Sequence, residues 1–413
     1  MPAASIRSQI RVRMRARPID EPHRASSQLE LLFDLTFVVA VAAVTAQLAH
    51  NIADGHGLSG VVPFLQVFFA IWWAWMNFTW FASSYDTDDV AYRLLTLVQM
   101  GGVLVIAAGV PAAAVHSDFV VVGLGYLVMR IGLVAQWLRA GLEDPASRRT
   151  ALRNAGGFSV LQVGWLLRHL LAGTGTLPSS LELLSFACLV VLELAVPRWA
   201  DRARPTNWHP HHIAERYGLF TIILLGEGVL AASRGVEGAL EAGGLSSPFV
   251  VVAVSGLVLL FAHWWLYFLV QAGEGLSVRR HRSYLWGYGH YGIFAALAAL
   301  GAGLEAAVEQ SGHAVEATPL ALGYAVAIPV GLYLALLWAV HALVALEPVI
   351  HPGAVLVGVA VILSLPLATP WIGVAAVVAA IAGISVLLVA VTIAAKADWA
   401  RAGKRRPGPE VPA

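Results

Sequence analysis

Two carboxylates lie near the start of the first apolar stretch of the chain. Residues 30–50, ELLFDLTFVVAVAAVTAQLAH, are long and apolar enough to cross a bilayer, and they contain Glu30 and Asp34. In a helix, side chains spaced i, i+4 share one face. Buried charges in a membrane are usually paired or face a cavity. Either Glu30 caps the helix and Asp34 pairs with a cation, or the two acids form a proton or cation site.

Arg130 is a candidate cation for these acids, because it lies near the middle of the fourth apolar stretch. We expect it to form an ion pair with Asp34 or with Glu193 of the sixth stretch, which would neutralise both partners. Binding of an anion by Arg130 is the alternative.

The second half of the chain supplies further ionisable groups in apolar stretches. Glu215 and Arg216 open one stretch, and Glu227 lies about three helical turns deeper on a nearby face. These carboxylates form a candidate proton relay, with two helix caps and one hydrogen-bonded core acid as the alternative. His263 and His290 follow, and each is either a packing residue or a group that titrates near neutral pH.

Several tryptophans lie too deep for an interfacial belt. Trp72 and Trp75 fall near the middle of the second stretch, and Trp264 occupies a similar place in the second half. Packing is the favoured role, and the indole N–H groups need acceptors. An aromatic-lined cavity that contacts a substrate is the alternative.

A short loop, SSYDTDDVAYR, places three acids before the third stretch: Asp86, Asp88 and Asp89. We expect Asp88 or Asp89 to cap the helix that follows. The alternative is that arginines of the amino-terminal arm dock on these acids in a gate-like contact.

These residues need membrane helices to position them. The chain is 58% hydrophobic and 12% charged, with a mean hydropathy of +0.73, so lipid is its expected solvent. At about 20 apolar residues per crossing, an all-α polytopic fold of about twelve transmembrane helices is predicted. The spans are expected near 30–50, 62–83, 94–115, 119–139, 155–173, 179–198, 213–233, 247–271, 285–307, 319–341, 353–369 and 371–395.

Lysine and arginine gather in alternate loops, which predicts that both termini are cytoplasmic. Short matches between the halves, such as WWAW at Trp72 and WWLY at Trp264, predict two parallel six-helix repeats with a site between them. The expected parts are a basic cytoplasmic amino-terminal arm (1–29), a first repeat (30–198), a cytoplasmic linker (199–212), a second repeat (213–395) and a basic cytoplasmic tail (396–413).

Three stretches of the chain resemble the bacterial low temperature requirement A (LtrA) family: ELLFDLTFVVAV, WWAWMNFTWFASSYDTDD with the following RLLTLVQMGGVLVIAAGVP, and ERYGLFTIILLGEGVL. The resemblance implies a multi-spanning protein of the bacterial cytoplasmic membrane, named for a growth phenotype and without an established molecular activity. The positions that carry the pattern are Glu30, Phe33, Asp34, Asp86, Asp88, Asp89, Glu215, Arg216 and Glu227. In the second half, Gly218 and Leu219 stand in or beside the places of Phe33 and Asp34, so the halves cannot do identical jobs.

A second similarity is to endolysosomal potassium channels, which have two six-helix repeats and a Phe-Ser-Asp motif on the first helix of each. Here Phe33 and Asp34 lack the intervening serine, and the stretch at 213–233 lacks the motif. These departures argue against a symmetric pore.

The leading functional hypothesis is a secondary transporter with a proton- or ion-linked site. The alternatives are an ion channel lined by the first and seventh helices, and an intramembrane enzyme acting on a lipid or isoprenoid. No nucleotide loop, serine elbow or metal-ligand helix motif is present, which argues against an enzyme. The NWHPHH segment (207–212) is expected to be a loop without a metal site. We expect no cofactor and no nucleic acid partner; the bilayer and a small molecule, ion or lipid are the expected partners, and a homo-oligomer stays open.

Overall fold

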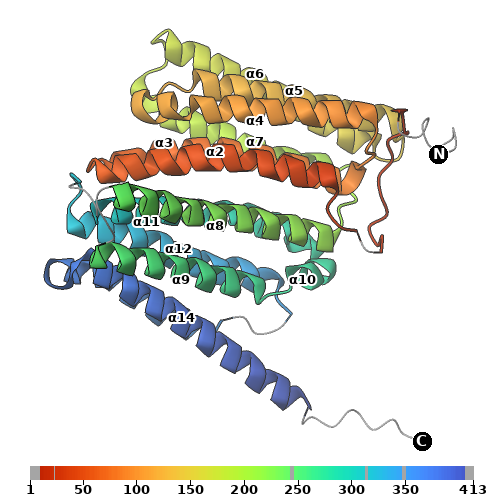
Figure 1. Cartoon of the computed structure of the whole chain (residues 1–413). Helices are drawn as coiled ribbons and strands as arrows, with labels where there is room; N and C mark the ends of the chain where they lie inside the picture. Colours follow the sequence, from red (N-terminus) through yellow and green to blue (C-terminus); the bar gives the residue numbers. More distant parts are fainter. Residues whose placement is uncertain (1–9, 23, 242–245, 312–314, 347–349, 405–413) are drawn as a thin grey trace, which may run out of the picture. The chain divides into compact units, whose positions relative to one another are not determined.

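The computed structural model describes residues 10–22, 24–241, 246–311, 315–346 and 350–404 (Figure 1). Within these ranges every regular element is a helix, which confirms the all-helical fold class. The helices are α2 (Gln28–Ala53), α3 (Gly57–Tyr85), α4 (Val90–His116), α5 (Val120–Glu143), α6 (Arg148–Gly173), α7 (Ser179–Asp201), α8 (Pro210–Glu241), α9 (Ser247–Phe268), α10 (Ala272–Val278), η1 (Arg280–Arg282), α11 (Ser283–Gln310), α12 (Pro319–Val344), α13 (Pro352–Ser364), η2 (Leu365–Ala368) and α14 (Thr369–Lys404).

Nine helical segments of the described chain are long and apolar enough to cross a membrane. A multi-pass membrane protein follows from this finding together with the composition. The segment Pro352–Trp399 counts as one of the nine, although the short 3₁₀ turn η2, which contains Pro366, separates α13 from α14 inside it. The number of twelve crossings and the internal duplication stay predictions.

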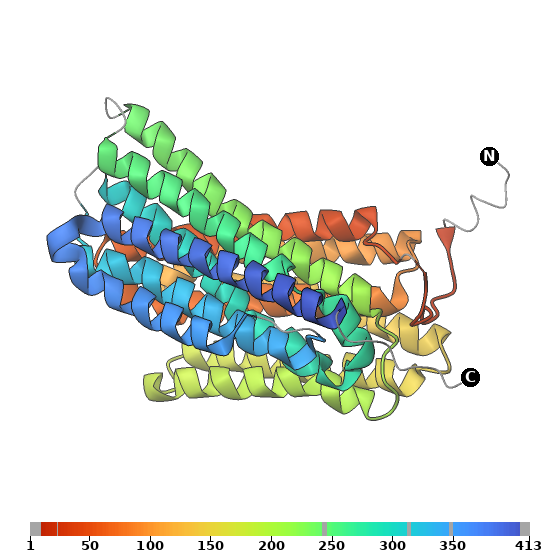
Figure 2. The same ribbon diagram turned by 90° about the horizontal axis from the view of Figure 1, so that it is seen from below.

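The chain forms two compact units. The first unit comprises residues 1–47 and 62–220, and the second comprises residues 48–61 and 221–413. In the first unit α4 packs on α5, α5 on α6, and α6 on α7 (Figures 1 and 2). The close approach of α4 and α5 depends on glycine, because a Cβ atom at Gly125 would lie 2.5 Å from the backbone N of Ile106.

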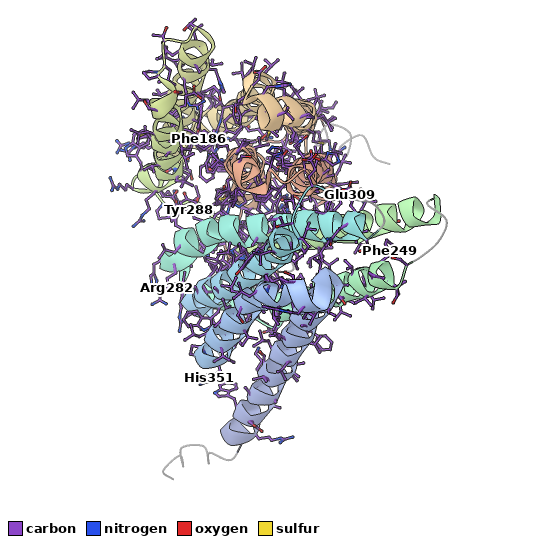
Figure 3. The ribbon with its side chains drawn as sticks, turned by 90° about the vertical axis from the view of Figure 1, so that its left-hand side faces the viewer. Phe186, Phe249, Arg282, Tyr288, Glu309 and His351 are labelled. Carbon is purple, nitrogen blue, oxygen red and sulfur yellow. The ribbon has the colours of Figure 1, made fainter. Side chains whose placement is uncertain are left out.

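In the second unit α11 packs on α12, and α9 packs on α14. Figure 3 shows side chains filling the space between these helices. Here too a glycine permits close packing, since a Cβ atom at Gly303 would lie 2.2 Å from the carbonyl oxygen of Ala325.

One end of the first unit carries most of its arginines, and we call it the arginine-rich end. The amino-terminal arm (residues 10–22 and 24–27) lies there with the loops at 86–89, 144–147 and 202–209. Helices α2 and α8 begin at this end and α3 finishes there, so their terminal residues meet. The candidate site is formed where the ends of these three helices lie together.

Candidate functional site: a buried charged network

Helix α2 begins with a reciprocal cap. The backbone N–H of Ser27 donates to Glu30 Oε2 at 2.7 Å, and the backbone N–H of Glu30 donates to Ser27 Oγ at 3.3 Å. This Ser-x-x-Glu arrangement is a capping box, which satisfies orphan donors at a helix start. The cap fixes the Glu30 carboxylate in place and leaves its Oε1 for other partners.

Arg216 of α8 binds both acids of α2. Its Nε and Nη2 donate to the two oxygens of Asp34 at 2.9 and 2.5 Å, and its Nη1 lies 3.0 Å from Glu30 Oε1. The side chains of Arg216 and Glu30 are fully buried, and Asp34 is 3% exposed. Trp75 Nε1 on α3 also donates to Asp34, at 2.7 Å. A two-pronged guanidinium–carboxylate contact of this kind is strong and directional.

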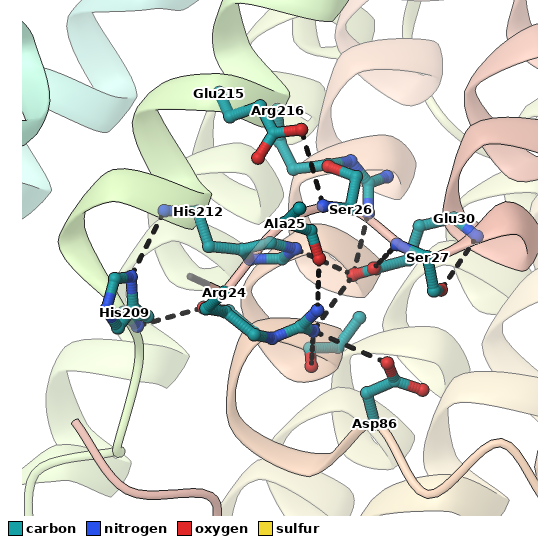
Figure 4. Close-up of polar contacts among 12 residues, drawn as sticks. Arg24, Ala25, Ser26, Ser27, Glu30, Asp86, His209, His212, Glu215 and Arg216 are labelled. Carbon is teal, nitrogen blue, oxygen red and sulfur yellow. Dashed lines mark hydrogen bonds and ion pairs between the residues drawn. The ribbon is translucent and has the colours of Figure 1, made fainter. Parts of the chain in front are cut away.

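Three further residues complete the cluster (Figure 4). His212 Nε2 lies 3.1 Å from Glu30 Oε1, and Arg24 Nη2 lies 3.5 Å from both Glu30 and Asp86. Arg24 also donates to the carbonyl oxygens of Ala25 and Ala82, at 2.6 and 3.3 Å. We define the charged network as Arg24, Glu30, Asp34, Asp86, His212 and Arg216.

Buried aromatic side chains of α2, α3 and α8 lie beside the network. The ring centroid of Trp75 lies 5.0 Å from Tyr217 and 4.4 Å from Phe220, while Phe33 stacks near Phe78 at 3.9 Å. All five rings are buried. Charges in such surroundings interact strongly, and a charge that loses its partner is costly.

The network contains one more carboxylate than guanidinium. Glu30, Asp34 and Asp86 face Arg24 and Arg216, so the buried charges sum to −1 while His212 is neutral. On the outer side Arg17 contacts Asp86 at 3.3 Å but also pairs with Glu21, and this couple adds no net charge. A single proton, on Asp86 or His212, makes the network neutral.

Asp86 is the carboxylate that we expect to hold this proton. The pKa of Asp86 is raised to about 6, mainly by burial and then by the negative charge of Glu30, while Arg24 and Arg17 oppose the rise. Asp86 follows the last residue of α3, at the arginine-rich end.

We predict a specific pH dependence of stability from Asp86. Between about pH 4 and about pH 6 the unfolded chain has lost this proton while the folded protein keeps it, so the folded state binds more protons. The free energy of unfolding therefore falls as pH rises through this window, by up to about 3 kcal/mol from this group. The measurement is the free energy of unfolding in micelles as a function of pH.

Asp86→Asn should flatten the dependence of this free energy on pH, and the control Asp88→Asn should leave it unchanged. An unchanged pH dependence in Asp86→Asn contradicts the assignment of the proton to Asp86.

The acidic loop caps α4, and its Asp86 contacts Arg17 and Arg24 of the amino-terminal arm; a gate-like role of these contacts stays a prediction. Asp89 caps α4 by accepting the backbone N–H of Tyr92 at 3.0 Å, and it also accepts the N–H of Val12 in the arm at 2.8 Å. Arg139 of α5 binds the same carboxylate at 2.8 and 2.5 Å. Asp88 pairs at the surface with Arg93. Burial acts to raise the pKa of Asp89, but the hydrogen bonds from Arg139, Val12 and Tyr92 lower it to about 2.

We predict that Asp89→Ala releases the arm. The change removes the α4 cap and the shared partner of Arg139 and Val12. Stability should fall by about 1–2 kcal/mol from the cap alone. Limited trypsin digestion should cut the arm several-fold faster. Asp88→Ala, which loses one exposed ion pair, is the control, and equal digestion rates in the two variants would refute the prediction.

A second buried cluster lies deeper in the first unit. Glu193 of α7 is fully buried and accepts Arg130 Nη2 at 2.9 Å, Trp73 Nε1 at 2.9 Å and Trp165 Nε1 at 3.1 Å. Arg130 also donates to the hydroxyl of Tyr126. Of the two partners expected for Arg130, the structure selects Glu193; Asp34 binds Arg216 instead.

The remaining predicted residues lie in other surroundings. Glu215 is exposed and accepts the backbone N–H of Ser26 at 3.3 Å. Trp72 is fully buried beside Trp73, whereas Trp264 is 45% exposed. Of the predicted residues, the network therefore brings together Glu30, Asp34, Asp86 and Arg216, and Trp75 donates a hydrogen bond to it at Asp34.

Three predicted residues lie in the second unit and are buried: Glu227, His263 and His290. His263 Nδ1 lies 2.5 Å from the carbonyl oxygen of Leu259, and His290 Nε2 lies 3.1 Å from the hydroxyl of Tyr267. Each histidine thus has a local hydrogen-bond partner.

Sequence reasoning missed two members of the network. The sequence predicts Arg24 only as part of a basic arm, and it predicts a loop at His212. The predicted loop is wrong for Pro210–His212, because α8 begins at Pro210, where a proline suits the first helical position. The Ser27-x-x-Glu30 spacing was the available signal for the helix start; no local pattern marked Arg24 or His212 as its partners.

The helices and the buried network define a polytopic membrane protein with a charged cluster at the helix ends of one compact unit. The profile of the bacterial low temperature requirement A protein (LtrA) family matches residues 25–395. The chain therefore belongs to the LtrA family, as its sequence motifs predicted.

A curated relative is the "Uncharacterized protein RA0937" of Rhizobium meliloti (strain 1021). It is 28% identical over 282 residues, which cover 64% of this chain and 65% of the relative. No solved structure gives a significant match to this chain.

Proposed function

We propose that this LtrA-family protein is a secondary transporter whose transport step is linked to a proton held by the charged network. The observation that carries the proposal is the charge count: three buried carboxylates face two guanidiniums, and one proton balances them. The expected site between the two halves stays a prediction.

The proton would control how firmly α2 is held to α8. With the proton bound, the network is neutral and its ion pairs close the contact between Glu30, Asp34 and Arg216. Loss of the proton leaves one uncompensated negative charge in an apolar shell, which weakens that contact. A local charge change that biases a two-state element is a common form of switch.

We place the protein in the bacterial cytoplasmic membrane with both termini in the cytoplasm, because the arginine-rich end fits the positive-inside rule. The network would then lie on the cytoplasmic side. A channel lined by α2 and α8 is less favoured, because the acids of α2 are paired with Arg216 rather than left for permeating ions.

The test uses proteoliposomes with a trapped pH-sensitive dye, challenged in turn with small organic anions, cations and neutral solutes. We expect one solute class to move protons, and Asp34→Asn and Glu30→Gln to slow this movement at least about tenfold. Glu215→Gln, at an exposed neighbouring acid, should leave it unchanged. Proton movement that survives both network variants, or passive current without any solute, contradicts the proposal.

A further inference from the structure

A cavity of about 40 Å³ lies in the first unit, in the half away from the arginine-rich end. We call it the aromatic pocket. Its walls include Phe69 of α3, Phe119 before α5, Trp165 of α6 and Phe186 of α7, which is labelled in Figure 3. Tyr126 of α5 also lines it. Four helices thus converge on a small pocket with mainly apolar walls and a few polar groups, the kind of lining that small-molecule sites use.

The pocket also contains a buried cation without a carboxylate partner. Arg168 is 8% exposed, and its guanidinium donates to Ser185 Oγ at 3.2 Å and to the carbonyl oxygen of Glu182 at 3.1 Å. In the described part of the chain no carboxylate forms an ion pair with it. Its direct hydrogen-bond partners are therefore neutral oxygens, and the negative charge of Glu182 acts on it only from beyond ion-pair distance. The guanidinium thus keeps the capacity to bind an anion in the pocket.

The pocket also contains a polar group with one unpaired atom. Gln162 is 6% exposed, and its Oε1 is buried without a hydrogen bond. Because the two ends of an amide exchange places by a simple rotation, this side chain can offer N–H or oxygen to a ligand. An unpaired buried amide costs free energy that a bound polar group would recover.

The pocket adjoins the second charged cluster. Trp165 and Tyr126 line the pocket, and each also makes a hydrogen bond in the cluster: Trp165 donates to Glu193, and Tyr126 accepts from Arg130. Tyr126 also lines a smaller cavity of about 10 Å³, together with Arg130. A ligand in the pocket would therefore press on the rings that hold the Arg130–Glu193 pair.

We propose that the aromatic pocket binds a small apolar monocarboxylate. The apolar body lies between the aromatic walls, the carboxylate binds Arg168, and the amide of Gln162 donates a second hydrogen bond to it. The acid comes either from water, as an aromatic acid, or from the bilayer, as an alkyl acid. This acid would be the substrate of the proposed transporter, so its transport rests on the proposed function. Its binding does not, because binding is measured without a proton gradient. A failure to bind and a failure to transport are therefore distinguishable.

The test is binding to the full chain in micelles, followed by tryptophan fluorescence and thermal unfolding. The probes are benzoate, octanoate, and the uncharged benzamide and octanamide. We expect a saturable response to at least one acid, with its amide bound at least about tenfold more weakly. A benzoate response indicates the aqueous source, and an octanoate response indicates the bilayer source. Equal binding of acid and amide, or no saturable response to either acid, overturns the proposal.

Variants assign the response to this pocket. Arg168→Gln should weaken binding of the acid at least about tenfold, whereas Arg153→Gln, on the same helix but stacked on Trp199 outside the pocket, should not. If Arg168→Gln does not fold, Ala70→Leu replaces it as the test. This variant should weaken binding of the acid, because the larger side chain fills the pocket that Ala70 lines. Binding as tight as in the parent in whichever of these two variants folds overturns the proposal.

Discussion

Arg216→Met should destabilise the protein by about 3–5 kcal/mol, measured as the free energy of unfolding in micelles. The guanidinium is fully buried and is the hydrogen-bonded cation partner of Asp34. Methionine approximates its volume, so the loss reports the uncompensated carboxylates rather than a cavity. The effect should be one of the two largest of any single substitution in the chain.

A second substitution separates lost charge pairing from lost packing. Arg216→Met combined with Asp34→Leu should recover part of the loss, because Glu30 keeps Arg24 and His212 while the unpaired acid is gone. Arg149→Met, at an exposed arginine of α6, should change stability by no more than about 0.5 kcal/mol. A loss below about 1 kcal/mol in Arg216→Met would show that the network contributes little to the folded state.

Glu193→Leu should cause a comparable loss of about 3–5 kcal/mol in the free energy of unfolding. The carboxylate accepts hydrogen bonds from Arg130, Trp73 and Trp165, so its removal leaves a buried guanidinium and two indole N–H groups without this acceptor. Glu193→Gln keeps one acceptor oxygen and should lose less.

The double variant Glu193→Leu with Arg130→Met should be more stable than Glu193→Leu alone, since it removes the unpaired cation. Glu309→Leu, at an exposed acid of the second unit, is the control and should stay within about 0.5 kcal/mol. If the double variant is less stable than the single one, the cluster is held by packing rather than by charge pairing.

The positions of the helices were readable from the sequence, because each requires a long apolar run. Local signals were readable too: Asp89 caps α4, and Glu30 lies at a helix start, as expected. Both depend on residues within a few positions of one another. The pairing of Arg130 with Glu193 was one of two stated alternatives.

The long-range partners were not readable, for a physical reason. A membrane helix is apolar on all sides, so its sequence does not mark which face meets which neighbour. Asp34 pairs with Arg216 across 182 positions, and that contact depends on the rotation of both helices. The same uncertainty left the orientation of Trp264 undetermined, and in the structure its side chain is 45% exposed.

The central claim is that the buried network, with one carboxylate more than guanidiniums, holds an exchangeable proton. Infrared difference spectroscopy of the protein in micelles, titrated with acid, tests it most directly through the carbonyl band of a protonated carboxyl group. The account predicts a band with a midpoint near pH 6, set by burial that raises the pKa of Asp86 to about 6, and loss of this band in Asp86→Asn. A band that persists in Asp86→Asn, or that titrates only near the ordinary carboxyl pKa of about 4, would contradict it.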